Sequence, residues 1–468
     1  MASALHAMYI SAMADYEALQ ARHAEQYQAL LNDHLARINW SEEQLRAERE
    51  RRLRAIISAA KERSPWHRDR LAHLDPERVT EADLPSIPPM TKEDLMRNFD
   101  AILTDRRLSR ASVEAHLDSL EGDAYLLDEY HVAASGGSSG TRGVFVYDWE
   151  GWLLFFLTFS RLRVRAQLAD PQIGLKPVRA VIAGGKASHM SYALAQTFGR
   201  GSGVVNVPAT LPVDDIVVRL NEMQPAMLTG YPSMMMILAR EADAGRLRIA
   251  PRLIGTASEP LLPEMRAAIE ATWACPVLNT YATSEGATAG SCGQGRGMHL
   301  NEDLCIFEPV DNEGRPVPAG QRAAKLYVTP LLNHAQPLIR YELTDEVTLI
   351  DEPCPCGSKL RRIDDIEGRA DDMFVYDGGV TVHPLSFRSL LGRERHVMEY
   401  QVRQTERGAA IALRADGEVH TAAIRDAIER ELAHLGLREP AVTVDVVNGF
   451  DRQSTGKLKR FFPLARGG

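Results

Sequence analysis

Residues 203–223, GVVNVPATLPVDDIVVRLNEM, join an apolar run to an amphipathic segment across a proline-containing connection. The run Gly203–Val207 predicts a short strand. Apolar residues recur at helical spacing in Val213–Met223, which predicts a helix. A strand followed closely by a helix is the repeating unit of parallel sheets. This stretch therefore predicts an α/β fold.

The same alternation continues on both sides of residues 203–223. Apolar runs bounded by glycine or proline predict further strands at Val178–Ile182, Pro276–Leu278 and Lys325–Thr329. Between several of these runs, helical periodicity is found in Ser233–Ala244 and Pro263–Thr272. Alternating strands and helices over this length predict a large domain with mixed sheets, substantial parallel pairing and flanking helices.

The pattern restarts on a smaller scale after Gly368. A helix is expected near Pro384–Leu391, and strand, helix and strand patterns follow to about Val447. About 100 residues are enough for an independent unit. We therefore divide the chain into a large domain, residues 1–369, and a small α+β domain, residues 370–468.

The opening section of about 110 residues is rich in Arg, Glu, Ala and Leu and is expected to be helical. Ser41 with Gln44 three residues later forms a capping-box pattern, which predicts the start of a helix. Pro65 ends that helix. Ser41 is therefore assigned to structure and not to catalysis. The residues before Trp40 match no specific pattern, which leaves open an accessory helix or a contact in a homodimer.

Composition and charge exclude several classes of protein. The 468 residues include 54 Lys+Arg and 63 Asp+Glu, a formal net charge of −9 that disfavours nucleic acid as the main partner. The longest uncharged stretch, residues 224–239, is interrupted by Pro and Gly and is shorter than the ~20 apolar residues of a membrane span. The first residues lack the basic region of a secretory signal, so the cytoplasm is the expected compartment. Five cysteines are too sparse for a disulfide framework.

One glycine-rich loop has the composition of an anion site. Residues 135–143 read SGGSSGTRG, and an apolar run, Val144–Tyr147, follows. Glycines allow backbone N–H groups to converge, and the hydroxyls of Ser138, Ser139 and Thr141 add donors for phosphate oxygens. The loop is not a P-loop, because the Gly-Lys-Ser/Thr ending is absent and a strand follows. Taken alone, such a loop is slightly more often a flexible connector.

Further motifs follow this loop in order along the chain. They read GTASEP at 255–260, NTYATSE at 279–285, RYELTD at 340–345, GRADD at 368–372 and STGK at 454–457. With the loop, their order and spacing resemble those of the adenylate-forming superfamily of acyl-CoA ligases, adenylation domains and luciferases. The stretch IPPMTKEDL at 87–95 and the element CPCG at 354–357 resemble its phenylacetate-CoA ligase-like branch. The resemblance implies a large ATP- and acyl-binding domain and a small mobile C-terminal domain.

The resemblance implies that ATP binds along these motifs. The phosphates would be held by Ser138, Ser139, Gly140 and Thr141. The adenosine would be framed by Ser258, Glu259, Pro260, Asn279, Thr280 and Tyr281. Asp345 would accept hydrogen bonds from the ribose hydroxyls, and Arg369 would lie beside the ribose and phosphates.

The catalytic groups are implied in the same way. A carboxylate and ATP are both anions, so their reaction requires neutralisation of charge at the phosphates. Glu285 would bind Mg²⁺, and Thr283 or Ser284 would contact the α-phosphate region. Lys457 would reach the α-phosphate when the small domain closes, and Asp371 would lie at the hinge. Judged singly, each of these residues is better explained as part of a turn, loop or surface, whereas the ordered set of motifs favours the functional roles.

Four residues have the composition of a structural zinc site. Cys292 and His299 are seven residues apart, and Cys354 and Cys356 share the CPCG turn. Three thiolates and one imidazole would complete a tetrahedral Zn²⁺ site closed to substrate. Two alternatives stay open, namely four unligated loop residues and a Cys-x-Cys redox pair.

The resemblance assigns the acyl pocket to Tyr231, Pro232, Gly255 and Ala282. Ala282 stands where the family usually has glycine. The added methyl group is expected to narrow the acyl pocket or to shift the Tyr281 backbone, so we expect a substrate other than phenylacetate. Aromatic and methionine walls would suit an aryl or arylalkanoic acid, although a Met-rich helix is more often plain core.

The chain is thus predicted to be an ATP-dependent carboxylic acid–CoA ligase that releases pyrophosphate and then AMP. ATP, Mg²⁺, CoA and a structural Zn²⁺ are the expected cofactors. Transfer of the acyl group to a carrier-protein thiol or to an amine stays open. A non-catalytic zinc-stabilised nucleotide-binding module is the alternative of another class. The joint presence of Glu285, Asp345 and Lys457 argues against that module, because binding alone needs no catalytic groups.

Overall fold

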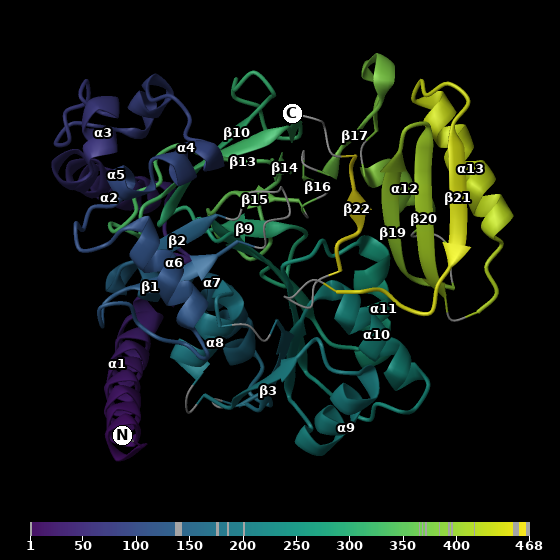
Figure 1. The fold of residues 1–468 in the computed structure, drawn as a ribbon, viewed down its shortest axis with the longest axis horizontal. Coiled ribbons are helices and arrows are strands. Elements are labelled where there is room, and N and C mark those ends of the chain that lie inside the picture. The colour runs from purple at the N-terminus through teal and green to yellow at the C-terminus, as the bar shows by residue number, and fades with distance from the viewer. Residues whose placement is uncertain are drawn as a thin grey trace.

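The computed structural model describes residues 2–135, 143–174, 177–184, 187–199, 202–364, 366, 368–369, 372–382, 384–391, 394, 396–415, 417–452 and 458–464. For residues 2–14, 368, 369, 385 and 389 it describes the backbone only. A large mixed sheet with flanking helices precedes a small four-stranded sheet (Figure 1). The α/β fold class predicted from the sequence is confirmed.

The opening section is helical, as predicted. It comprises α1 (Ala2–Arg37), α2 (Glu42–Arg63), α3 (Pro65–Arg70), the 3₁₀ helix η1 (Glu81–Ser86), α4 (Lys92–Arg97), α5 (Phe99–Ile102) and α6 (Arg110–Ser119). The expected capping box begins α2. The Ser41 N–H donates to Gln44 Oε1 at 2.9 Å, and the Gln44 N–H donates to Ser41 Oγ at 3.2 Å. The chain before Trp40 forms the single long helix α1.

A large sheet organises the middle of the chain. Its order within the described residues is β11-β14-β15-β9-β8-β7-β6-β5-β3-β4, with β16 beside β14. The strands are β3 (Arg179–Ala183), β4 (Val204–Pro208), β5 (Met227–Gly230), β6 (Leu253–Ala257), β7 (Val277–Ala282), β8 (Thr288–Gly290), β9 (Met298–Leu300), β11 (Arg322–Ala323), β14 (Asp345–Ile350), β15 (Arg362–Ile363) and β16 (Gly368–Arg369). The strands β3 to β7 pair in parallel, whereas β7, β8, β9, β15 and β14 pair antiparallel.

Helices cover both faces of the parallel part of this sheet. One face is covered by α9 (Val213–Met223), α10 (Pro232–Asp243) and α11 (Pro263–Trp273), which bury Ile182, Leu228 and Ile254. The other face is approached by α7 (Trp149–Ala169) and α8 (Met190–Gly199). The predicted helix Val213–Met223 has the observed bounds of α9, because its apolar residues and the left-handed residue Gln224 at its end both mark the helix locally.

Two smaller antiparallel sheets flank the large one. The hairpin β1 (His131–Ala134) and β2 (Val144–Tyr147) holds both ends of the glycine-rich loop. The strands β10 (Cys305–Val310), β12 (Lys325–Pro330) and β13 (Tyr341–Leu343) form the second sheet. A bridge between Met90 and Tyr341 ties the opening section to it.

The C-terminal part of the chain has its own sheet and hydrophobic core. Its elements are β17 (Phe374–Val375), the 3₁₀ turn η3 (Asp377–Gly379), β18 (Thr381–Val382), α12 (Pro384–Leu391), β19 (Val397–Thr405), β20 (Gly408–Ala415), α13 (Thr421–His434), β21 (Ala441–Val446) and β22 (Phe461–Phe462). The sheet order is β21-β20-β19-β22, and Phe374, Phe387 and Phe461 meet in its core. The sequence pattern predicted one strand before α13 where the structure has the hairpin β19–β20, because the turn between them is only two residues long.

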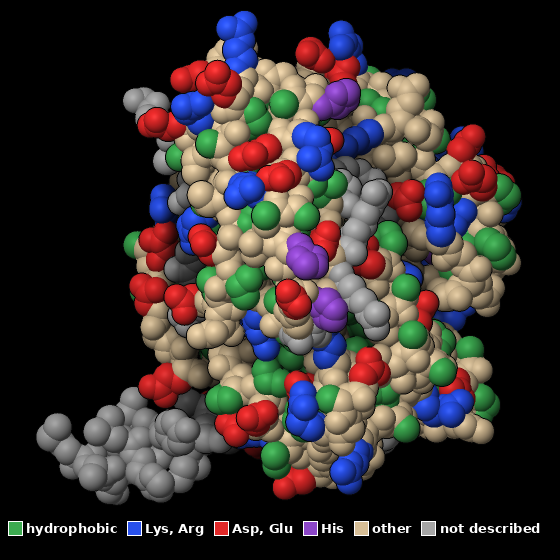
Figure 2. All heavy atoms as spheres, turned by 90° about the vertical axis from the view of Figure 1, so that its right-hand side faces the viewer, with side chains coloured by type: hydrophobic (Ala, Val, Ile, Leu, Met, Phe, Trp, Pro, Cys, Tyr) green, Lys and Arg blue, Asp and Glu red, His purple; other side chains and the backbone are tan. Residues whose placement is uncertain are grey.

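The outer face of this part is mixed in charge. Figure 2 shows the face at the right of Figure 1, where Lys and Arg side chains are interspersed with Asp and Glu. Among the described helices, none is both long and apolar enough to cross a membrane.

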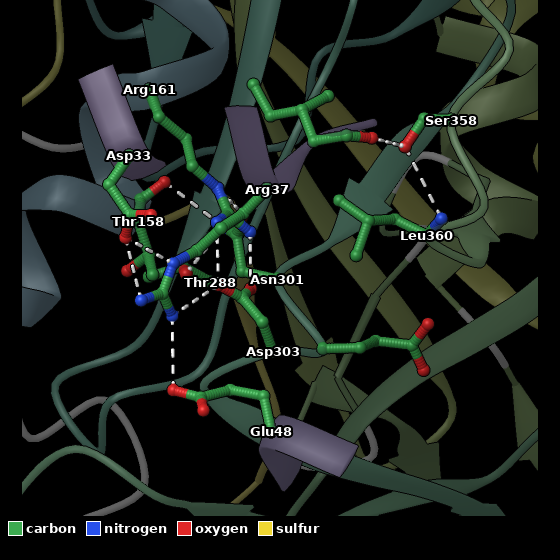
Figure 3. A network of polar contacts seen from close by, with 12 residues as sticks. Asp33, Arg37, Glu48, Thr158, Arg161, Thr288, Asn301, Asp303, Ser358 and Leu360 are labelled. Atoms are coloured by element: carbon green, nitrogen blue, oxygen red, sulfur yellow. Dashed lines mark hydrogen bonds and ion pairs between the residues drawn. The ribbon is translucent and has the colours of Figure 1, made fainter. Parts of the chain in front are cut away.

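A buried polar network joins α1, α2, α7 and the large sheet (Figure 3). The guanidinium of Arg161 donates to both carboxylate oxygens of Asp303, at 2.9 and 2.6 Å, and neither side chain is exposed. Its Nε donates to Asn301 Oδ1 at 2.8 Å, and Asn301 donates to Thr288 Oγ1 at 2.7 Å. Arg37 of α1 lies 3.8 Å from the same aspartate. The network therefore fixes the opening helices against β8, which follows the expected Mg²⁺ glutamate.

Candidate active site and metal centre

A pocket of about 180 Å³ lies between the large sheet and the helices α7 and α8. It reaches the carboxyl ends of β3, β5, β6 and β7, which is where α/β sheets usually bind ligands. Many residues singled out in the sequence line it although they are far apart in the chain. They are Tyr231, Gly255, Ser258, Thr280, Ala282, Thr283 and Ser284.

The backbone is strained at one lining residue. Ser258 has φ of +71°, a left-handed conformation that side chains other than glycine and asparagine rarely adopt. Such conformations persist where the surrounding structure enforces them, and they are enriched at functional sites. Ser258 directly follows β6, so its left-handed conformation changes the direction of the backbone at the sheet edge that borders the pocket.

Asp345 and Tyr281 form a hydrogen-bonded pair beside this edge. Asp345 begins β14 and is 3% exposed, and Tyr281 Oη donates to its Oδ2 at 2.8 Å. The antiparallel register places Arg369 of β16 opposite Asp345. Three predicted nucleotide-binding positions from separate motifs are thus neighbours, although the Arg369 side chain lies outside the described residues.

Asn279 is a buried residue of β7 that forms hydrogen bonds with neighbouring strands. It lies on β7, is 5% exposed, and accepts a hydrogen bond from Thr256 Oγ1 at 3.1 Å. Its backbone N–H donates to Ser291 Oγ at 3.1 Å. Asn279 therefore positions β7 against β6, and it does not line the pocket.

Glu285 lies in the tight turn between β7 and β8. The turn is closed by Thr283, whose Oγ1 accepts from the Ala287 N–H at 3.3 Å. Tyr147 Oη donates to the backbone oxygen of Ser284 at 2.8 Å. Burial, and then the negative charge of Glu285, raise the pKa of Tyr147 and of Tyr341 well above the ordinary value. The Glu285 side chain is half-buried, and its carboxylate offers the oxygen ligands that Mg²⁺ prefers.

Glu259 connects the pocket edge to the C-terminal segment. Its carboxylate accepts from the Ser233 N–H at 3.2 Å and from the Leu458 N–H at 3.1 Å. Arg452 donates to Ser233 Oγ at 3.4 Å and pairs with Glu399 of β19. Leu458, which follows Lys457 in the chain, is therefore held beside Glu259 at the pocket edge.

Several of the predicted site residues are not among the residues that the structure describes. They are Ser138, Ser139, Gly140, Thr141, Asp371 and Lys457. The two ends of the glycine-rich loop are described. Ser135 and Gly143 pair through a backbone bond of 2.9 Å and a second bond from the Gly143 N–H to Ser135 Oγ at 2.8 Å. Neighbouring Ala134 lines the pocket, so the loop begins and ends beside it.

Three of the four residues predicted for the acyl pocket line the observed pocket. Tyr231, Gly255 and Ala282 line the pocket, whereas Pro232 is the buried first residue of α10 and is not among the lining residues. Sequence reasoning missed the opposite wall, which consists of Phe155, Phe156, Phe159 and Arg163 of α7 with Met190 and Leu194 of α8. The spacing of the α7 residues, three and four apart, was the available signal for a shared helix face.

Cys292, His299, Cys354 and Cys356 converge on one point. Their ligand atoms all lie within 4.8 Å of one another. The sulfurs of Cys292 and Cys354 are 3.5 Å apart, and Cys356 Sγ is 3.4 Å from His299 Nε2. Zn–S bonds of ~2.3 Å at tetrahedral angles place two sulfurs roughly 3.8 Å apart, so the cluster has the size of a zinc site.

The surroundings of the cluster also fit a metal. His299 is fully buried and its Nδ1 contacts the Leu360 oxygen at 3.0 Å, which leaves Nε2 facing the sulfurs. Burial would raise the pKa of Cys292, but the hydrogen bond with His299 and backbone N–H donors lower it to about 6, which favours a thiolate. Gly297 has φ of +80°, and a Cβ there would lie 2.4 Å from the Ile363 oxygen, so only glycine lets the loop close.

Comparisons with known proteins agree with this geometry. No family model matches the chain. It is 28% identical over 384 residues to a phenylacetate-coenzyme A ligase of Thermus thermophilus, covering 77% of this chain and 78% of that protein. It is 25% identical over 455 residues to the phenylacetate-coenzyme A ligase of Escherichia coli, covering 91% and 96%. Over most of its length the chain is therefore similar to phenylacetate-CoA ligases.

A solved structure has a similar fold. It is 2-hydroxyisobutyryl-CoA ligase in the postadenylation state in complex with R3-HIB-AMP, with a TM-score of 0.70, 19% identity and 90% of both chains covered. The likeness extends over the large sheet and the C-terminal part alike, because nine-tenths of this chain is included.

Proposed function

We propose that the protein is an ATP-dependent carboxylic acid–CoA ligase of the AMP-forming kind. The acid and ATP form an acyl-adenylate and pyrophosphate, and CoA then takes the acyl group and releases AMP. The observation that carries this proposal is the convergence of Ser258, Thr283 and Ser284 at one pocket with Asp345 beside it. These residues come from three separate motifs, and the resemblance assigns all three motifs to the ATP site.

The ATP roles follow from position. The Asp345 carboxylate, held by Tyr281, would accept from the ribose hydroxyls, with Arg369 on the neighbouring strand. Glu285 would hold Mg²⁺, which supplies charge neutralisation at the phosphates. Ser284 and Thr283, at the pocket's edge, would contact the α-phosphate region. The loop containing Ser138, Ser139, Gly140 and Thr141 is assigned to the phosphates from its sequence.

Lys457 is proposed as the group that stabilises charge during adenylation, and Asp371 as the hinge of the small domain. The contact between Glu259 and the Leu458 N–H supports this role, because the chain next to Lys457 then lies at the pocket edge. A lysine is a flexible point charge that can reach the α-phosphate and the attacking carboxylate together.

The Cys/His cluster is proposed to hold one structural Zn²⁺. Cys292, His299, Cys354 and Cys356 supply four ligands, so no position is left for substrate. The site would tie the 292–299 loop to the 354–356 turn, far from each other in the chain.

The pocket walls support an aryl or arylalkanoic acid as substrate. Phe155, Phe156 and Phe159 face the sheet across the pocket, and flat rings stack well between such walls. CoA is proposed as the acceptor and the cytoplasm as the compartment.

Pyrophosphate release tests the proposal. We would measure it across aryl and aliphatic acids, with and without CoA, for the wild type, Lys457→Ala and the charge-matched control Lys459→Ala. Release that needs one acid and Lys457 but tolerates the control is expected, with turnover requiring CoA. Adenylation that turns over only with a carrier protein or amine would overturn the CoA assignment. ATP binding without release for any acid would favour the non-catalytic module.

A further inference from the structure

Two arginines line the pocket of the candidate active site. Arg163 lies on α7 one turn after Phe159, on the helix face that forms the pocket wall. Arg179 begins β3 and shares a strand face with Val181 and Ala183, which also line the pocket. The aromatic face of α7 and the pocket face of β3 thus each carry one positively charged side chain.

The arginines lie at the end of the pocket remote from the reacting groups. Ala183 is at the carboxyl end of β3, the edge shared with Ser258 and Ser284, whereas Arg179 is four residues away at its amino end. Four residues of extended strand span roughly 13 Å. That length accommodates an aromatic ring or a short alkyl chain between a carboxylate at the edge and a group at the arginines.

Neither guanidinium has a partner in the described part of the chain. No hydrogen bond or ion pair joins Arg163 or the Arg179 side chain to a described residue, and Arg179 Nε is buried without an acceptor. The undescribed residues up to position 201 include no Asp or Glu. Tyr27 Oη lies near both but is hydrogen-bonded to Ser160 Oγ.

Two unpaired positive charges in one pocket are costly. Burial, and then the charge of Arg163, hold the pKa of Arg179 well below its ordinary range. Burial also lowers the pKa of Arg163. An arginine nevertheless stays protonated in proteins, so both groups call for an anion.

Arg161 lies on the same helix as Arg163 and shows how a buried arginine is neutralised elsewhere in this fold. It is fully buried and is matched by the two carboxylate oxygens of Asp303. Arg161 thus has a carboxylate partner in the core, whereas no described residue supplies a carboxylate to Arg163 or Arg179, which line the pocket.

We propose that the acid activated by this protein carries a second oxyanion at its far end, bound by Arg163 and Arg179. The inference rests on the proposed function and narrows its substrate to acids with two anionic groups separated by an apolar spacer. A second carboxylate, a sulfonate and a phosphonate share the required chemistry, because each offers two or more oxygens to paired guanidinium groups.

Matched acids test the proposal. We would measure kcat/KM for adenylation with α,ω-dicarboxylic and carboxyphenyl acids, their monomethyl esters, and analogues with a terminal sulfonate or phosphonate. The monoester keeps the length and removes one charge. We expect the diacid to exceed its monoester at least tenfold, a difference of about 1.4 kcal/mol, because charge-assisted hydrogen bonds contribute that much or more. The order among the three anions identifies the terminal group.

Variants then assign the effect to the arginines. Arg163→Met and Arg179→Met should each lower kcat/KM for the diacid tenfold or more and leave the monoester within about twofold. Arg219→Met on the exposed face of α9 removes the same charge elsewhere and should change neither. Arg163→Lys keeps the positive charge. If Arg163→Met is weakened through loss of this charge, Arg163→Lys should retain more of the activity with the diacid, whereas similar losses in both variants would indicate damage to the fold.

The outcomes separate the two proposals. Equal use of diacid and monoester by the wild type, or equal loss of both in the arginine variants, would overturn the inference while the ligase function stands. Absence of pyrophosphate release with every acid would overturn the ligase function. In that case calorimetric binding of diacid and monoester to the wild type and Arg179→Met still decides whether the pocket prefers a second anion.

Discussion

Substitution of Arg161 by methionine is expected to destabilise the protein severely. The Arg161 guanidinium and the Asp303 carboxylate are both completely buried and form two hydrogen bonds of 2.9 and 2.6 Å. Methionine fills a similar volume without a charge, so Asp303 would stay buried with Arg37 at 3.8 Å as the nearest arginine. The hydrogen bond from Arg161 Nε to Asn301 would also be lost.

The magnitude follows from what remains buried. Removal of one partner of a buried ion pair costs about 3–5 kcal/mol, because the other charge stays without compensation. Arg37 offsets part of this cost, so we expect about 4 kcal/mol, or roughly a thousandfold in the unfolding equilibrium. The double variant Arg161→Met, Asp303→Leu removes both charges and should recover most of the loss.

Urea unfolding followed by circular dichroism measures this expectation. The single variant should have a much lower midpoint, and the double variant a midpoint close to the wild type. Arg37→Met is the comparison variant, and a smaller loss than for Arg161→Met is expected because Asp303 then keeps both hydrogen bonds from Arg161. A loss under about 1 kcal/mol for Arg161→Met, or a double variant no more stable than the single one, would refute the reasoning.

Four further outcomes are expected. Asp345→Ala should raise the KM for ATP at least tenfold, because a ribose acceptor is lost, and an unchanged KM in steady-state assays would remove it from the ATP site. Lys457→Ala should nearly abolish adenylation but spare conversion of preformed acyl-adenylate to thioester; equal losses in the two half-reactions contradict its role. Elemental analysis should find about one zinc per chain in the wild type and little in Cys354→Ser, and a metal-free wild type excludes the zinc site. Burial lowers the pKa of three histidines to about 3. They are His23, His34 and His67. As the pH falls below about 6.5, the unfolded chain therefore binds protons at these histidines before the folded chain does. The free energy of unfolding should then decrease by up to ~1.4 kcal/mol per pH unit and histidine until the pH nears 3. Urea midpoints that do not change between pH 7 and pH 5 would contradict the histidine prediction.

Local signals were read correctly from the sequence where they were sufficient. The Ser41–Gln44 capping box and the α9 bounds depend on residues within one or two turns, and the structure has both. The hairpin β19–β20 was read as one strand, because its two-residue turn breaks the apolar pattern only briefly. Motif order was sufficient for the superfamily, since each motif is a short contiguous segment.

The sequence by itself determined the fold class, the resemblance to adenylate-forming ligases and the side-chain types of the Cys/His cluster, because periodicity, motif order and residue chemistry are local properties. Only the tertiary structure decided which distant residues meet. It pairs Tyr281 with Asp345, brings the four Cys and His side chains together with their sulfur and nitrogen atoms within 4.8 Å of one another, and leaves Pro232 out of the pocket lining. It also separates Arg161, which is paired in the core, from Arg163, which faces the pocket two residues later. Helical rotation turns neighbouring side chains to different faces, and only packing determines what each face contacts.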